Sequence, residues 1–232
     1  MRRRLTITLG LIALLLLQAA DADAKRKKKE VEVDTVKVAF VNGFTIHADL
    51  IGAYQILFTD HGQWEVGARI NLKDRFFPAV EAGWGKADHT DEYNNKLTYQ
   101  AKAPYFRVGC DFNILKNKHD KYRALVGVRY GFCSFNYDRC IAHTEKKGEG
   151  EEQEVVVTYI QYNDLHATYH YVDLLIGMQA KIWGPLILGW DVRYRRLLAS
   201  KQAEEAEPWY IPGFGGQKTG GIAVNFNLTF GF

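Results

Sequence analysis

The sequence is short of cysteine and has no strong excess of either charge, and each shortage excludes a class of protein. Three cysteines in 232 residues, none in a CxxC pair, form neither a disulfide framework nor a zinc pattern. The 30 basic residues are nearly balanced by 27 acidic ones, so nucleic-acid binding is not indicated. With 47% apolar and 25% charged residues, the chain has the composition of one folded domain. We therefore expect a folded protein with no metal, no other cofactor and no nucleic-acid partner.

The sequence also lacks an apolar run long enough to cross a membrane as a helix. Its amino terminus has three arginines at positions 2–4, nine apolar residues from Leu9 to Leu17, and a small-x-small pattern at 22–24. A membrane-anchoring helix needs about 20 apolar residues, whereas this arrangement is typical of a secretory signal. We predict a cleaved signal peptide over residues 1–24, followed by a basic periplasmic leader over 25–43.

Beyond position 41, apolar and polar residues alternate with the period of two that is typical of β-strands. In the segment 63–73 every even position is apolar, and every odd position is polar, charged or glycine. Over eight such segments, 45 of 46 even positions are apolar or proline, and 14 of 45 odd positions are charged. The other seven segments are Phe44 to Phe58, Phe76 to Gly85, Pro104 to Asn113, Tyr122 to Phe132, Tyr171 to Ile182, Leu186 to Arg195 and Gly221 to Phe232.

The length and spacing of these segments favour a membrane barrel over a soluble one. They are 10 to 15 residues long, whereas a soluble strand has about 5 to 6 residues. Their connections have 4, 2, 18, 8, 38, 3 and 25 residues, the alternation of short turns and long loops seen in outer-membrane barrels. We predict an all-β fold, an eight-stranded antiparallel up-and-down transmembrane β-barrel over residues 44–232. The alternative is a soluble calycin-like ligand-binding barrel, in which the charged face would meet water.

In the membrane version, the odd-position charges and His47 face a narrow lumen. An eight-stranded barrel is just wide enough for side chains to fill, and the charges nearly cancel, so we predict a paired network that plugs the lumen rather than a pore. Glycines at odd positions would relieve crowding there. The charged positions are Asp49, Glu65, Arg69, Lys73, Glu81, Arg107, Asp111, Arg123, Arg129, Asp173, Lys181, Asp191, Arg193 and Arg195.

The last segment carries a family resemblance. Ile222 to Phe232 alternates strictly and ends on Phe232, which resembles the C-terminal aromatic signal that the barrel-assembly machinery reads. The chain as a whole resembles small OmpA/OmpX-type barrels, and its segments 105–137 and 208–232 are similar to uncharacterised outer-membrane families of Bacteroidota. The resemblance implies an outer-membrane location in a Gram-negative bacterium, contact with membrane lipid, and no established activity.

Long outer loops are the expected place for recognition, because a barrel fixes their ends and leaves their sequences free. The 38-residue connection has an acidic stretch over 145–154 and then a β-prone stretch over 155–160, which predicts a hairpin that extends beyond the membrane. The last loop holds Trp209, Tyr210 and Phe214, which form either a binding patch for an extracellular protein or glycan, or the aromatic edge of the barrel. We expect a structural or surface-recognition role without catalysis.

A lipid A-modifying enzyme is the catalytic alternative. Such chemistry needs a serine or histidine with a supporting acid near the outer leaflet, and Ser134, His170 and Asp138 are the candidates. Polar residues at strand ends more often mark the membrane interface, so we expect no catalytic site. We also expect Cys133 and Cys140 to remain free thiols, since seven residues of extended chain would separate them by about 23 Å.

Overall fold

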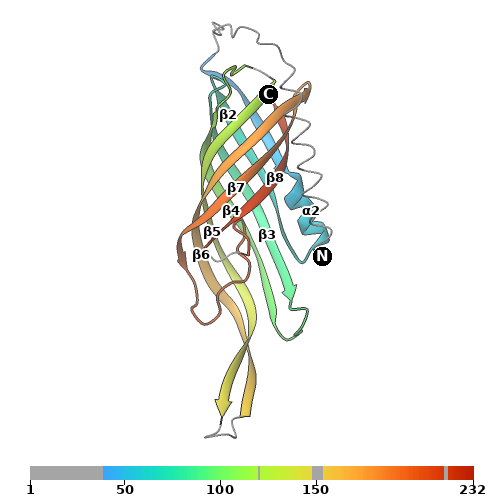
Figure 1. Cartoon of the computed structure of the whole chain (residues 1–232), viewed down its shortest axis with the longest axis vertical. Coiled ribbons are helices and arrows are strands. Elements are labelled where there is room, and N and C mark those ends of the chain that lie inside the picture. Colours follow the sequence, from blue (N-terminus) through green and yellow to red (C-terminus); the bar gives the residue numbers. More distant parts are fainter. Residues whose placement is uncertain (1–38, 120, 148–153, 217–218) are drawn as a thin grey trace, which may run out of the picture. The chain divides into compact units, whose positions relative to one another are not determined.

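The computed structural model describes residues 39–119, 121–147, 154–216 and 219–232. The predicted signal peptide and most of the predicted leader lie outside the described residues. Eight strands pair antiparallel in sequence order, and β8 pairs with β1 to close the barrel (Figure 1). The predicted eight-stranded up-and-down fold is confirmed. The strands are β1 Val41–Asp49, β2 His61–Leu72, β3 Phe76–Thr90, β4 Thr98–Asn113, β5 Tyr122–Lys147, β6 Glu154–Trp183, β7 Leu186–Lys201 and β8 Gly220–Gly231.

The apolar face of each strand points outward. On β2, Val66 and Ile70 are 43% and 48% exposed, whereas Glu65 and Arg69 are 2% and 3% exposed. A soluble calycin-like barrel requires the reverse arrangement, because its apolar side chains fill the interior. The predicted orientation, with the apolar face outward and the charged face toward the lumen, is therefore confirmed.

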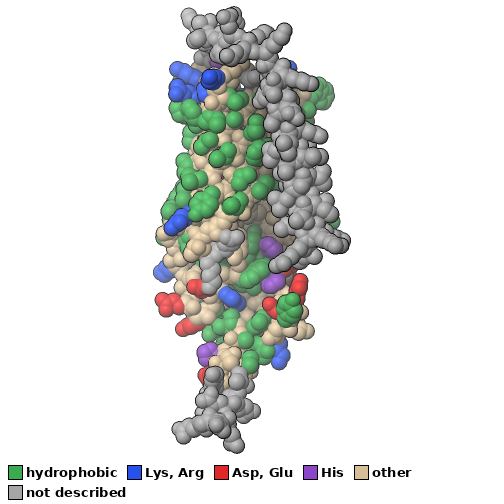
Figure 2. All heavy atoms as spheres, viewed as in Figure 1, with side chains coloured by type: hydrophobic (Ala, Val, Ile, Leu, Met, Phe, Trp, Pro, Cys, Tyr) green, Lys and Arg blue, Asp and Glu red, His purple; other side chains and the backbone are tan. Residues whose placement is uncertain are grey.

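The outward apolar residues form a belt that ends at about the same level on neighbouring strands. On β3 the outward positions are apolar over the nine residues from Phe76 to Trp84 and become charged at Lys86. On β5 they change from Phe132 to Ser134. The two ends of the barrel are named here by their connections: the turn end carries the short turns after β2 and β6, and the hairpin end carries the β5–β6 hairpin. In Figure 2 hydrophobic side chains cover the half of this face nearer the turn end, and most acidic and histidine side chains lie nearer the hairpin end.

The first predicted strand is wrong in its second half. β1 ends at Asp49, and residues Leu50–Phe58 form the helix α2. The Asp49 carboxylate caps this helix, since its Oδ2 accepts from the backbone N of Gly52 at 3.0 Å. Nearly every residue of 50–58 is apolar, so the segment satisfies the strand period and the helix period alike. An aspartate directly before an apolar run was the available signal for the helix start.

The strands are longer toward the hairpin end than the alternation predicted. β3 and β4 are joined by seven residues rather than 18. The β5 and β6 ladder continues to the pair Lys147↔Glu154, and Figure 1 shows this hairpin projecting past the other strands. The predicted hairpin extension is therefore present. No helix among the described residues combines the length and the hydropathy needed to cross a membrane.

Candidate functional site

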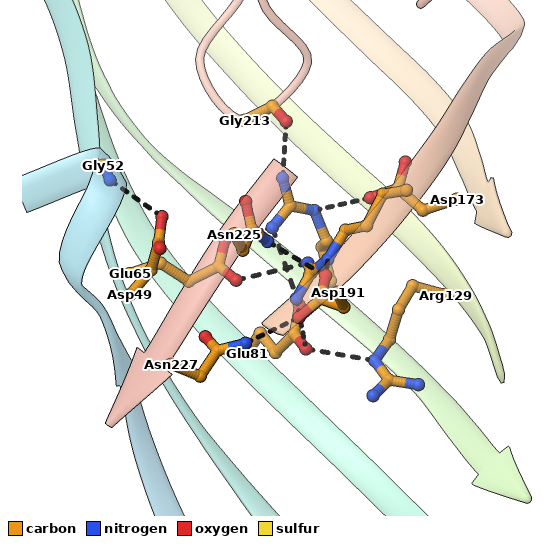
Figure 3. Close-up of polar contacts among 12 residues, drawn as sticks. Asp49, Gly52, Glu65, Glu81, Arg129, Asp173, Asp191, Gly213, Asn225 and Asn227 are labelled. Atoms are coloured by element: carbon orange, nitrogen blue, oxygen red, sulfur yellow. Dashed lines mark hydrogen bonds and ion pairs between the residues drawn. The ribbon is translucent and has the colours of Figure 1, made fainter. Parts of the chain in front are cut away.

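Two buried glutamates form the centre of the lumen network. Glu81 on β3 accepts from Arg193 Nη1 at 2.7 Å and from Arg129 Nε at 3.2 Å. Glu65 on β2 accepts from the Tyr105 hydroxyl at 2.8 Å and from Arg193 Nη1 at 3.2 Å, and it also pairs with Arg107. These groups come from five strands, so the network ties opposite walls of the barrel together (Figure 3).

Three aspartates complete the pairing around this centre. Asp111 lies 2.9 Å from Arg69 Nε and 2.7 Å from Arg129 Nη1. Asp191 accepts from Arg193 Nε at 2.6 Å. Asp173 lies 3.2 Å from Arg107 Nε and 3.6 Å from Arg195 Nε. The structure thus places ten of the predicted lumen charges in one buried cluster: Glu65, Arg69, Glu81, Arg107, Asp111, Arg129, Asp173, Asp191, Arg193 and Arg195.

Four predicted members lie elsewhere. Asp49 caps α2 instead of joining an ion pair. Lys181 pairs with Ile187 on β7 but is exposed, because it lies near the turn end of β6. Lys73 is exposed in the turn between β2 and β3. Arg123 lies at the turn end, 3.4 Å from Asp74 Oδ1.

Sequence reasoning missed a polar cluster centred on Asp74. Lys73 and Asp74 have positive φ angles of 54° and 56°, as the two central residues of a tight hairpin turn require. Asp74 accepts from Asn42 Nδ2 at 2.8 Å and lies 2.7 Å from His119 Nδ1. Burial alone would raise the pKa of Asp74, but hydrogen bonds from Asn71 and His119 and the charge of Arg123 outweigh it and lower that pKa. The charged form of Asp74 therefore stabilises the turn by accepting these hydrogen bonds.

The hairpin-end half of the lumen is filled by aromatic rings. Tyr105, Tyr137 and Tyr171 are all at most 2% exposed. A Cβ added at Gly131 would collide with the ring of Tyr171, and one at Gly83 would collide with the ring of Tyr105. Glycine at these odd positions makes room for the rings, as the sequence predicted.

The loop between β7 and β8 folds into this aromatic region instead of covering the surface. The carbonyl oxygen of Gly213 accepts from Arg107 Nη2 at 2.5 Å, and that of Phe214 accepts from Arg195 Nη1 at 3.2 Å. Arginines of the lumen network thus hold the loop in place, and Figure 3 draws the hydrogen bond to the Gly213 carbonyl as a dashed line.

This insertion changes the interpretation of the predicted loop-recognition residues. Tyr210 and Phe214 are each 4% exposed, and the Tyr99 hydroxyl donates to the Tyr210 carbonyl at 2.5 Å. Trp209 is half-buried and stacks on His89 with ring centroids 4.0 Å apart. Tyr210 and Phe214 therefore do not form the binding patch that was one of their two predicted roles, because they pack inside the barrel.

One group of potential metal ligands lies within the network. His47, Glu65 and Glu81 each offer a ligand atom, and these atoms lie within 4.8 Å of one another. Both glutamates already pair with arginines, whose positive charges oppose a cation. The arrangement fits an ion-pair network better than a metal site.

The three residues that were candidates for the catalytic alternative, Ser134, His170 and Asp138, are not brought together. His170 Nδ1 lies 2.6 Å from the Tyr130 hydroxyl, and Asp138 Oδ1 accepts from the backbone N of Asp164 at 2.7 Å. Ser134 Oγ instead lies 3.2 Å from His166 Nε2. The registers Ser134↔Thr168 and Phe132↔His170 are the reason, because they place His170 one row closer to the belt than the serine.

The chain terminus and the cysteines complete the predicted residues. Phe232 stacks on Phe44 with centroids 4.8 Å apart, and its backbone N donates to the Phe44 carbonyl at 2.8 Å. The last residue therefore helps to close β8 onto β1. Cys110, Cys133 and Cys140 have free thiols.

Comparison with known proteins gives a fold neighbour and a family. The crystal structure of Neisserial surface protein A (NspA) aligns with a TM-score of 0.43 and 11% sequence identity, covering 83% of this chain and 99% of that chain. No curated protein shows a significant match. The family model described as Domain of unknown function (DUF6048) matches residues 4–232, and the chain therefore belongs to that family.

Proposed function

We propose that the chain is an integral outer-membrane protein with its hairpin end outside the cell. The observation that carries this proposal is the belt of exposed apolar side chains around a closed barrel with a charged interior. The nine residues from Phe76 to Trp84 match the 9 to 11 residues of a tilted membrane strand. Lys86 and Lys102 end the belt toward the hairpin end on β3 and β4.

The same interior argues for a structural or recognition role and against a diffusion pore. Ion pairs fill the lumen near the turn end, and rings together with the β7–β8 loop fill it near the hairpin end. Recognition then falls to the β5–β6 hairpin, where Val156 and Val157 are 39% and 46% exposed. Such a strand ribbon offers backbone and side-chain groups to an extracellular protein or glycan.

Location and orientation are tested by labelling single cysteines in a chain whose three native cysteines are replaced. Thr158→Cys lies on the exposed hairpin and Lys116→Cys is exposed between β4 and β5 at the turn end. We expect a membrane-impermeant maleimide to label Thr158→Cys on intact cells, and Lys116→Cys only after the outer membrane is permeabilised. A protein recovered without detergent, or the reverse labelling, would refute the proposal.

The recognition role is tested by shortening the hairpin. Residues 141–160 are replaced by Asn-Gly, which joins the paired positions Cys140 and Gln161 by a favourable two-residue turn. We expect the barrel to keep its heat-modifiable gel migration, while cell adhesion and aggregation change as much as in a full deletion strain. Deletion phenotypes that the shortened protein fully rescues would assign the role to another part of the chain.

A further inference from the structure

A serine, a histidine and an asparagine are linked in series on the outward face of β5 and β6. Ser134 Oγ lies 3.2 Å from His166 Nε2, and His166 Nδ1 lies 2.7 Å from Asn136 Oδ1. All three side chains are exposed. A nucleophile, a base and a group that orients the base occur in this order in hydrolases that act through a serine.

The surrounding hydrogen bonds determine which atom donates and which accepts at each link of this series. Asn136 Nδ2 donates to Asp164 Oδ1 at 2.6 Å, and a carboxylate only accepts. The amide oxygen of Asn136 must then face His166, so His166 carries its proton on Nδ1. The lone pair of Nε2 is left facing Ser134 Oγ, as a general base requires.

A local irregularity in the strands holds Asp164 in this position. The β5–β6 register shifts between Tyr137 and Arg139, and Asp164 has a positive φ of 56°. Asp138, which the sequence singled out, accepts from the backbone N of Asp164 at 2.7 Å. Bulges and left-handed non-glycine residues occur often beside functional sites, where they aim side chains.

The group lies where the lipid belt ends. Ser134 is the next outward residue after Phe132, and Pro104 and Phe106 precede the same boundary on β4. In a membrane this level is the junction of acyl chains and headgroups, where the ester carbonyls of lipids are found. The Thr168 hydroxyl, 3.2 Å from Ser134 Oγ, supplies a donor beside the reacting oxygen.

Two lysines beside the group favour an anionic headgroup. Lys86 and Lys102 are directly paired across β3 and β4, and both are exposed. Like charges in this position repel each other, and an anion between them would remove the repulsion. A surface hollow of about 340 Å³ is lined by both lysines, by Asn136 and by the aspartates Asp88, Asp138 and Asp164. Each of these aspartates accepts a hydrogen bond within the chain. The lysines therefore border the same depression as Asn136.

We propose that Ser134, His166 and Asn136 form a lipid acyl-hydrolase site for phosphate-bearing lipids of the outer leaflet. Ser134 Oγ attacks the ester carbonyl carbon while its proton passes to His166 Nε2. The ester C–O bond then breaks, and the leaving alcohol takes that proton. Water, deprotonated by His166, next cleaves the acyl-serine, which releases a fatty acid and restores the Ser134 hydroxyl. Asn136 is a positioning residue that holds the imidazole.

The composition of the chain makes covalent labelling a sharp test. Ser134 and Ser200 are the two serines of the sequence, so a fluorophosphonate probe has one candidate and one matched control. We expect full-length protein, folded in detergent micelles, to carry the probe on Ser134. Labelling should vanish in Ser134→Ala, slow at least about 100-fold in His166→Gln, and stay unchanged in Ser200→Ala.

The positioning role and the substrate class need two further comparisons. Asn136→Asp combined with Asp164→Asn keeps an oxygen toward His166 and reverses the hydrogen bond between positions 136 and 164, so it should retain most of the labelling rate. Asn136→Leu should lose about tenfold or more. Release of oleate should be faster from micelles containing dioleoyl phosphatidylglycerol than from those containing dioleoylglycerol. Lys86→Gln with Lys102→Gln should abolish that preference.

The inference rests on the membrane location proposed above, but labelling in micelles does not depend on location, so the two proposals fail separately. Heat-modifiable migration establishes that each variant is folded. Folded wild-type protein that neither takes the probe nor releases oleate overturns the hydrolase site. Equal labelling of wild type and Ser134→Ala, or labelling at Ser200, overturns it as well.

Discussion

Replacing Glu81 by glutamine tests whether the lumen network stabilises the barrel. The Glu81 carboxylate receives hydrogen bonds from Arg193 Nη1 at 2.7 Å, Arg193 Nη2 at 3.3 Å and Arg129 Nε at 3.2 Å. Arg107 Nη1 lies 3.6 Å away. Removing one charge from a buried pair typically costs about 3 to 5 kcal/mol, because it leaves the opposite charge uncompensated. Glutamine keeps the size and one accepting oxygen, so we expect a loss of about 3 kcal/mol in the free energy of unfolding.

The matched control is Asp88→Asn on the outward face of the same strand. Asp88 is exposed and accepts from Gln100 Nε2 at 3.1 Å, so its loss should cost less than about 1 kcal/mol. Urea unfolding in micelles, followed by tryptophan fluorescence and by the heat-modifiable band, measures both variants. Equal stability of the two variants would refute the assignment of a stabilising network. Adding Arg193→Met to Glu81→Gln should cost less than the sum of the single changes, since the two groups interact.

Three further predictions concern the turn end, the lumen and the inserted loop. The pKa of Asp74 is lowered in the folded state, so its charge stabilises the fold above its unfolded pKa, and this stability is lost as the pH falls through the folded pKa. Asp74→Asn should therefore lower the free energy of unfolding at pH 7 by about 1 kcal/mol. Urea titrations should show this difference shrinking as the pH is lowered. Gly131→Ala should reduce the heat-modifiable fraction by colliding with a tyrosine ring, whereas Gly231→Ala, whose added Cβ meets atoms no nearer than 3.7 Å, should not. Replacing residues 208–216 by a short flexible linker should make the buried thiol of Cys133 react with a maleimide when it is the sole cysteine, and bilayer recordings should still show no steady conductance because the ion-pair network remains.

Most of the strand pattern was predictable, because the outward and inward faces of a strand require different residue types, and these types alternate in the sequence. Within the belt, one face of each strand is apolar and exposed while the other carries buried polar groups, so a period of two marks each strand and separates outward Val66 from inward Glu65. The strand prediction is wrong at Leu50–Phe58, where apolar residues at both odd and even positions remove the contrast between the two faces. It is also wrong at Lys181, which pairs with the buried residue Ile187 but is exposed because it lies near the end of its strand.

The candidate catalytic group was also predictable only in part from the sequence. Sequence reasoning identified Ser134 as a polar residue at the right depth, but it chose His170 and Asp138 as partners. Strand register decides which histidine lies beside the serine, and it placed His166 there. The bulge near Asp164 then set the orientation of Asn136, which no periodicity encodes.

By itself the sequence determined the number of strands, their order and the face that each turns outward, because these follow from local alternation and chain length. Only the tertiary structure decided which arginine pairs with which carboxylate and that the loop near Gly213 enters the barrel. Both depend on groups such as Arg107 and Gly213, 106 positions apart in the chain, that meet only after the barrel has closed. A contact between such distant groups is a property of the closed geometry, and local composition carries no record of it.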